Sequence, residues 1–200
     1  VVTQREVGID TQSFDDALKS SLRQAPDVIL IGEIRSMETM EYAMSFADTG
    51  HLCVATLHAN NANQAIERIM HLAPKDQHDK LRFDLSLNIR AIVAQQLVPT
   101  TDGKGRVAAI EILLNSPLVT DLIQRNEIGS LKEAMKKGKE QGMQSFDMAL
   151  YSLYREGKID VEQALHHADS PNDLRLMIKL DANTGASLGT LSNVSIDMDD

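Results

Sequence analysis

The stretch Pro26-Asp27-Val28-Ile29-Leu30-Ile31-Gly32-Glu33-Ile34-Arg35 decides the fold class of this chain. Branched apolar residues lead directly into a glycine, a carboxylate and a guanidinium. An unbroken apolar run of this kind is typical of a strand buried on both faces, as at the centre of a parallel sheet. Such sheets bind ligands at the carboxyl ends of their strands, so we expect Glu33 and Arg35 at a binding site.

A second apolar strand is expected at residues 51–57, and helical spacing surrounds the two strands at 14–25, 36–49 and 60–70. This alternation predicts an α/β fold with parallel pairing and right-handed crossovers. Residues 1–8 are expected to form a further strand closed by Gly8. The pattern at 81–93 fits both a strand and a helix, and its length favours a helix. A hairpin is expected from 94–98 and 107–114, around a turn at 101–105.

The remainder divides into short helices and a polar end. Helical signals recur at 116, 128–140, 145–156, 160–168 and 170–180, which predicts a small helical bundle over 116–180. Residues 181–200 contain four aspartates, no basic residue and little apolar content. We therefore expect a disordered acidic tail there.

Composition narrows the class of protein. A chain of 200 residues with 42% apolar and 24% charged residues can form one domain with a sizeable core. A net charge of −9 without a basic patch argues against nucleic acid as a partner. The one cysteine, Cys53, allows no internal disulfide, fits a reducing cytoplasm and is expected to be a small buried hydrophobe. No apolar stretch is long enough to predict a membrane span, and no signal peptide is evident.

Glu33 suggests phosphoanhydride hydrolysis, which needs a phosphate cradle, a magnesium ligand, a water-orienting carboxylate and positive charge. Glu33 is the candidate carboxylate, and a surface acid at a strand end is the alternative. Arg35 either answers charge that develops in the reaction or pairs with Glu38 one helical turn away. None of the eleven glycines is followed by Lys and then Ser or Thr, so the chain lacks the cradle motif and is not expected to hold a nucleotide tightly.

Two histidines bracket the second strand. Seven residues of strand place His51 and His58 roughly 20–24 Å apart, at opposite ends, which argues against a shared metal site. His58 follows Thr56 at the carboxyl end, near the expected position of Glu33, and could sense a γ-phosphate through an imidazole N–H. A hydrogen-bonded loop histidine is the alternative. No metal site is predicted from this chain.

Several motifs occur in order and resemble the type II/type IV secretion ATPase superfamily. They are Gln4-Arg5-Glu6-Val7-Gly8, the stretch 26–35 with Glu38-Thr39, Thr49-Gly50-His51-Leu52 and Thr56-Leu57-His58. The match is to the retraction branch, the PilT/PilU group of twitching-motility ATPases. Residues 51–61, Ala94-Gln95-Gln96-Leu97 and 168–175 resemble its PilU members most. The resemblance covers about residues 1–180.

The resemblance implies the second half of a RecA-like, mostly parallel-sheet ATPase domain at 1–115, followed by the helical bundle. It implies that Glu33 is the Walker B glutamate, with Gly32 replacing the usual aspartate. It also implies phosphate-sensing roles for Thr49, Gly50, His51, Thr56 and His58, with Arg5 in the element that leads to the site. Such motors are homo-hexamers that use ATP and Mg²⁺ at the cytoplasmic face of the inner membrane, beside a pilus platform protein.

Two departures qualify this resemblance. The phosphate-binding loop lies upstream in the family, and the chain opens on Val1 rather than Met, so we interpret it as the C-terminal portion of a longer protein, inactive alone. The family's retraction motif Ala-Ile-Arg-Asn-Leu-Ile-Arg-Glu is matched at 118–125 only by Leu122 and Ile123. This predicts an accessory motor beside a PilT-like retraction ATPase. The alternatives are a related assembly or secretion ATPase, whose usual paired cysteines are missing here, and a non-hydrolysing interaction module.

Overall fold

The computed structural model describes residues 2–191. Strands β1 (Val28–Ile31) and β2 (Leu52–Ala55) pair in parallel, with Val28 opposite Leu52 and Ile31 opposite Ala55. The crossover between them is α2 (Met37–Asp48), which Ser36 caps by accepting from the Thr39 N–H. The helix stops at Thr49 and at Gly50, whose φ of 89° suits glycine.

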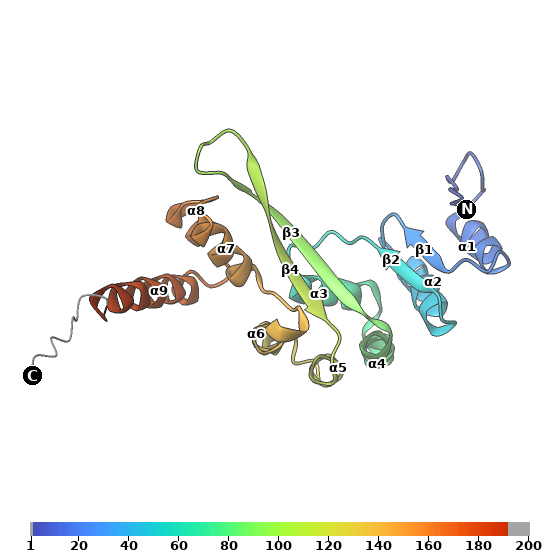
Figure 1. Ribbon diagram of the computed structural model, residues 1–200. Helices are drawn as coiled ribbons and strands as arrows, with labels where there is room; N and C mark the ends of the chain where they lie inside the picture. The colour runs from blue at the N-terminus through green and yellow to red at the C-terminus, as the bar shows by residue number, and fades with distance from the viewer. Residues whose placement is uncertain (1, 192–200) are drawn as a thin grey trace, which may run out of the picture.

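A long antiparallel hairpin crosses the middle of the molecule (Figure 1). It consists of β3 (Ala91–Pro99) and β4 (Arg106–Leu114), paired along their whole length. The other helices surround the two sheets. They are α1 (Phe14–Leu22), α3 (Ala62–Leu72), α4 (His78–Asn88), α5 (Pro117–Gln124), α6 (Leu131–Lys137), α7 (Phe146–Arg155), α8 (Val161–His167) and α9 (Pro171–Leu191), with short 3-10 turns η1 (Lys75–Gln77), η2 (Ile128–Ser130) and η3 (Lys139–Gln141).

The buried apolar residues form two clusters. The first joins β1, α2, α3, α4, α5 and α6, with Phe46 and Ile66 among its fully buried members. The second joins the hairpin to α7, α8 and the start of α9, around Phe146 and Leu150. This packing differs from the division expected at residue 115, because α5 and α6 bury their apolar faces in the first cluster rather than in a separate bundle.

The sequence predicted parallel strands buried on both faces, but in the structure only one face is buried. Ile29 and Ile31 are buried under α2, but Val28 and Leu30 are 55% and 73% exposed. The exposed side continues onto β2 through Leu52 and Val54. The prediction was wrong for the described part of the chain, since no element of that part covers this face of the sheet.

Three other expectations need correction. Residues 2–7 form no strand among the described residues; Val7 makes a single bridge to Thr11, since no neighbouring strand pairs with this segment. The helix expected over 81–93 ends at Asn88, because Ile92 and Val93 pair with β4 and lengthen the hairpin.

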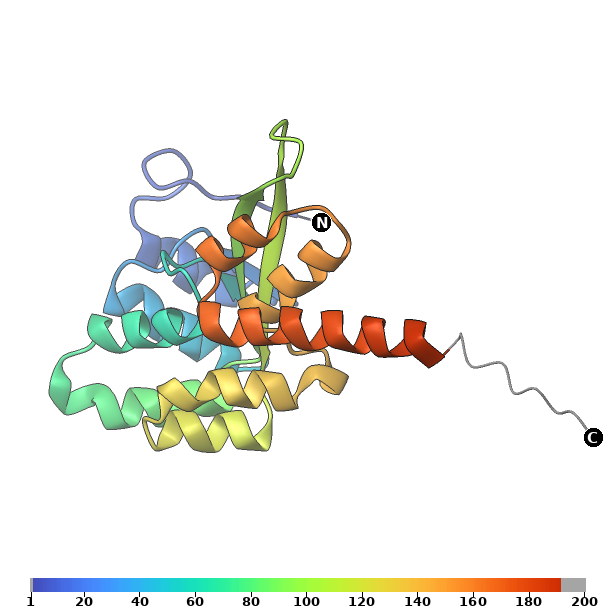
Figure 2. The same cartoon turned by 90° about the vertical axis from the view of Figure 1, so that its left-hand side faces the viewer.

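The third correction concerns the expected tail. The α9 backbone continues through residues 181–191 as helix, and residues 192–200 lie outside the described part of the chain. No proline interrupts the segment, and each added residue gains a backbone hydrogen bond. Asp181 also pairs with Arg155 of α7 at 3.2 Å. Figure 2 shows α9 beginning beside the body and extending away from it. No helix within residues 2–191 combines the length and apolar character that a bilayer crossing requires.

Candidate functional site

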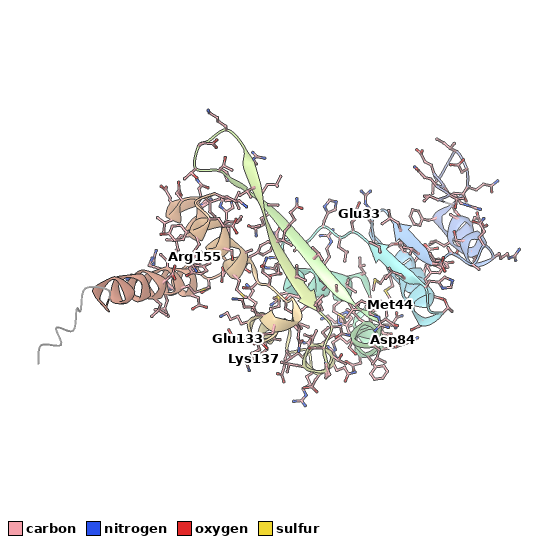
Figure 3. The ribbon with its side chains drawn as sticks, viewed as in Figure 1. Glu33, Met44, Asp84, Glu133, Lys137 and Arg155 are labelled. Carbon is pink, nitrogen blue, oxygen red and sulfur yellow. The ribbon has the colours of Figure 1, made fainter. Side chains whose placement is uncertain are left out.

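Glu33 lies just beyond the carboxyl end of β1, on the segment that faces the β2 exit (Figure 3). The pairing of the two strands continues past their ends. The Ile34 N–H donates to the Thr56 carbonyl at 3.0 Å, and the Thr56 hydroxyl donates to the Gly32 carbonyl. The chain segments that carry Glu33 and His58 are therefore held side by side, as the sequence predicted from parallel pairing.

Both oxygens of the Glu33 carboxylate have cationic or donor partners. The Arg35 Nε–H donates to Oε2 at 2.6 Å, and His58 Nε2 lies 2.9 Å from Oε1. The Arg35 and His58 side chains are largely exposed, whereas the Glu33 side chain is 19% exposed. The result is a shielded carboxylate between two groups that water and ligands can reach.

The charges around Glu33 keep it ionised. The Arg35 hydrogen bond lowers the pKa of the Glu33 carboxyl, and the positive charges of Arg35, His58 and Arg68 add to this, while partial burial opposes it. An ionised carboxylate is an acceptor only. Glu33 can therefore orient a water molecule or take part in binding a cation through water, and it is a weak proton acceptor at neutral pH.

A second group of predicted residues lies at the opposite, amino-terminal end of β2. The His51 Nδ1 lies 2.9 Å from the Thr49 hydroxyl and 3.2 Å from the Phe46 carbonyl, and its ring packs edge-on against Phe46. Together with Gly50, these residues shape the turn from α2 into β2. The structure thus brings Glu33, Arg35, Thr56 and His58 together and places Thr49, Gly50 and His51 apart from them.

The two arginines predicted to belong to the site, Arg35 and Arg5, differ in their contacts with Glu33. Arg35 pairs with Glu33, and no ion pair to Glu38 occurs among the described residues. Arg5 lies in the segment before Gly8, and in the described structure it forms no ion pair with Glu33.

Sequence reasoning missed two charged residues that bear on this site. Arg68 of α3 adds positive charge around Glu33, and its position on the helix that follows the His58 loop (residues 57–61) could have signalled it. Glu111 of β4 is fully buried and accepts from the Ala62 N–H at the start of α3. Its signal is a carboxylate in phase with the buried residues Ala109 and Leu113 of the strand.

A groove of about 780 Å³ lies elsewhere, between α6, α7 and α9. Its lining contains methionines together with basic and acidic residues, among them Met143, Met148, Met177, Lys139, Arg155 and Asp173. Figure 3 shows Arg155 and Glu33 on different parts of the molecule. The groove is therefore separate from the Glu33 site.

The Glu33 site fits part of what ATP and Mg²⁺ require. Arg35 and His58 carry N–H donors of the kind that bind phosphoryl oxygens, and in this structure both contact Glu33. Mg²⁺ in nucleotide sites is held by few carboxylates together with phosphates and water. Among residues 2–191 no group of three or more His, Cys, Asp or Glu side chains could hold a metal ion alone. The phosphate-binding loop motif is not in the sequence.

Known proteins are similar to this chain in sequence and in fold. A family model described as "Type II/IV secretion system protein" matches residues 3–166. The chain is 66% identical over 93% of its length to the "Type IV pilus ATPase PilU" of Pseudomonas aeruginosa, covering 49% of that protein. It is 40% identical over 87% of its length to a "Twitching motility protein" of Neisseria gonorrhoeae, covering 46% of it.

A solved structure agrees with these relatives. The pilus retraction motor PilT with bound ADP superposes with a TM-score of 0.78 at 40% identity, covering 88% of this chain and 49% of that one. The chain thus spans about half the length of the relatives it matches. The strand–helix–strand arrangement agrees with part of a RecA-like ATPase domain. The chain therefore belongs to the type II/IV secretion system protein family, within which it is similar to the pilus ATPases PilU and PilT.

Proposed function

We propose that this chain is the part of a PilU-like ATPase motor that presents the water-orienting glutamate and the phosphate-sensing histidine. The observation that carries the proposal is the Glu33 carboxylate, held at the carboxyl end of β1 between Arg35 and His58. This is the edge of a parallel sheet at which ligands bind. Glu33 and His58 keep the roles that their motifs predicted, Thr56 takes a structural role instead of phosphate sensing, and Arg35 supplies positive charge.

In this proposal each residue has a separate task. ATP with Mg²⁺, held by a phosphate loop that this chain does not contain, would supply the phosphoryl group. Glu33 accepts a hydrogen bond from the attacking water, for which its ionised state is suited. His58 contacts the same carboxylate, so a change at its imidazole is passed directly to Glu33. Thr56 fixes the spacing of the two strand exits through the Gly32 carbonyl.

Replacing Glu33 in the full-length protein tests this assignment. We expect Glu33→Gln and Glu33→Ala to lower the ATPase kcat by roughly 100- to 10,000-fold while ATP binding persists. Glu38→Gln is the matched control, because Glu38 lies exposed in the first turn of α2 and forms no ion pair with Arg35 in the described structure. Turnover retained in both Glu33 variants would remove this residue from its role.

The proposal extends to the oligomeric state, the location and the partners of the motor in the cell. The motor is a cytoplasmic homo-hexamer at the inner face of the inner membrane, acting on the pilus platform protein as accessory to a PilT-like ring. Its support lies in α5, where the two residues that match the retraction motif, Leu122 and Ile123, are buried together with Val119. At the positions of the two motif arginines, Thr120 donates to Asn115 and Gln124 donates to Ser86, both neutral partners.

The accessory role is tested by pilus retraction in cells. We expect no retraction when this protein is present and its PilT-like partner is deleted, and stronger retraction against load when both are present. Retraction by this protein alone would contradict the accessory role without affecting the ATPase assignment.

A second candidate, a non-hydrolysing interaction module, is favoured by one observation: the cradle motif is missing from these 200 residues. Titration of the isolated chain with ATP is expected to show no tight binding. If the full-length protein also fails to hydrolyse ATP, the interaction module becomes the better description. Tight binding by the isolated chain would contradict our account of the phosphate site.

A further inference from the structure

We propose that Glu111 is a positioning residue that anchors the loop carrying His58 to the hairpin, and through the hairpin to the C-terminal helices. The proposal rests on the proposed function of His58. Glu111 itself lies on β4, outside the motifs that assign the site. It is fully buried, on a strand face shared with Ala109 and Leu113.

The first argument is the hydrogen bond that Glu111 accepts from the start of α3. Its Oε1 lies 2.7 Å from the N–H of Ala62, the first residue of α3. This N–H belongs to the helix end that has no acceptor within the helix. Asn61 accepts from the Gln64 N–H instead, so the capping side chain leaves the Ala62 N–H for Glu111. A carboxylate at this position is also favoured by the helix dipole.

The second argument is the short distance along the chain between this contact and the site. Only residues 59–61 separate His58 from Ala62. The loop is fixed at its other end by the Thr56 hydroxyl on the Gly32 carbonyl. Glu111 therefore holds the end of the loop next to α3, while the other end is held against the segment that carries Glu33. If the Glu111 contact is lost, the α3 end of the loop is held only by the packing of Ala62 and by the contacts of α3 itself.

The third argument is what lies behind Glu111. Lys132 of α6 and Asp169, in the turn before α9, both act on its charge. Those two side chains pair with each other at 2.9 Å, and Asp147 of α7 accepts from the Asp169 N–H at 2.8 Å. The neighbouring residue Ile112 donates its N–H to the Gln144 carbonyl at 2.7 Å, so β4 itself connects the start of α3 to the segment that leads into α7. A movement of the C-terminal helices would therefore reach the strand that carries Glu111.

A fourth observation separates Glu111 from an ordinary packing residue. Its second oxygen, Oε2, is buried and accepts no hydrogen bond of ordinary length and angle in the described structure, although the backbone N–H of Phe146 is near enough to lower the Glu111 pKa. Such a group is costly, and a leucine of similar volume would remove the cost. A carboxylate at this position therefore contributes less to stability than an apolar residue could. We infer that Glu111 serves as the hydrogen-bond acceptor for the Ala62 N–H.

The test compares Glu111→Leu with Glu111→Gln in the full-length protein. Glu111→Leu keeps the volume and removes the acceptor, so we expect the Ala62 amide to exchange with solvent roughly tenfold faster or more. We also expect increased nanosecond mobility of residues 57–61, measured by ¹⁵N relaxation, while amides in β3 and β4 keep their protection. Glu111→Gln keeps an acceptor oxygen and should restore both. Asn63→Ala is the matched control, because it removes a different tether of α3, the contact to the Ile128 carbonyl.

The functional arm uses the full-length ATPase. Glu111→Leu should lower kcat at an unchanged KM for ATP, with recovery in Glu111→Gln. Unchanged Ala62 exchange in Glu111→Leu would overturn the proposal, and so would a uniform loss of protection across the chain, which indicates a merely structural role. A full-length protein without any ATPase activity would refute the proposed function, but the exchange result would still decide whether Glu111 anchors the loop.

Discussion

Each of the two sheets of this molecule is associated with one carboxylate of functional interest, and the two carboxylates differ in burial and in the kind of partner they contact. Glu33 lies beyond the end of a short parallel pair, and its partners, Arg35 and His58, reach solvent. Glu111 stands in the middle of a long hairpin, fully buried, with a backbone N–H as its partner. The surroundings lower the pKa of Glu33 and raise that of Glu111, where burial is the main cause.

This contrast teaches how position selects the task of a carboxylate. The partners of Glu33 are side chains that can swing away, so the carboxylate can exchange them for water or a ligand. The partner of Glu111 is a helix terminus that cannot move without moving α3. The first geometry suits chemistry, and the second suits the transmission of position.

The largest expected effects come from the aromatic residues that support each sheet. Phe46 is fully buried in the first cluster and Phe146 in the second. Replacing either with alanine should cost about 3–5 kcal/mol of unfolding free energy, from lost transfer energy and the cavity left behind. Denaturant unfolding measures this cost, and Phe83→Ala is the control because Phe83 is mostly exposed on α4.

Hydrogen exchange in the same two variants sharpens the comparison. Phe46→Ala should release the amides of β1 and β2 first, and Phe146→Ala those of the hairpin. Equal release of both sheets in both variants would show that the two clusters unfold as one cooperative unit.

The pH dependence of stability should separate the two carboxylates by sign. The folded pKa of Glu111 is raised above the ordinary value of 4.5, so the folded state keeps a proton that the unfolded chain releases. Its contribution to the unfolding free energy is therefore present at acidic pH and falls as pH rises from about 4.5 through the raised pKa. The folded pKa of Glu33 is lowered, so its contribution is present above 4.5 and is lost as pH falls through the lowered pKa.

Unfolding free energies of the wild type, Glu111→Gln and Glu33→Gln, measured from pH 3 to 8, check these signs. The wild type minus Glu111→Gln difference should decline with rising pH, and the wild type minus Glu33→Gln difference should increase. Asp169 and Lys132 face Glu111 in all three proteins and largely cancel in the differences. Slopes of the same sign would contradict the contrast between the two sites.

The sequence predicted the site better than it predicted the packing around it. Glu33 and His58 could be placed together because parallel strands bring their carboxyl ends to one edge, a consequence of local pattern alone. Burial of both faces of β1 could not be read from Val28 and Leu30, because it depends on what covers the sheet. The partner of Arg35 was missed because a side chain two residues away along an extended segment competes with one a helical turn ahead. Glu111 was missed because one carboxylate in a strand carries no motif, and only the tertiary contact with Ala62 explains it.

The smallest expected stability effect concerns Arg35, and it tests how mobile the surroundings of Glu33 are. Arg35 is exposed, so Arg35→Ala should leave the thermal midpoint almost unchanged. The Glu33 pKa should rise toward its ordinary value, because its largest lowering cause is removed, and a ¹³C carboxyl titration measures this. Arg35→Lys is the control that keeps the charge and loses the planar fork.

The same variants separate the two roles of Arg35 in turnover. Its Nε and Nη2 both contact one oxygen of Glu33, so the guanidinium is engaged with the carboxylate rather than held ready for a phosphoryl group. We therefore expect Arg35→Ala in the full-length protein to lower kcat by less than the roughly 100-fold typical of a lost transition-state donor. A larger loss, not recovered by Arg35→Lys, would mean that Arg35 leaves Glu33 during the reaction and that the exposed pair is a resting arrangement of the site.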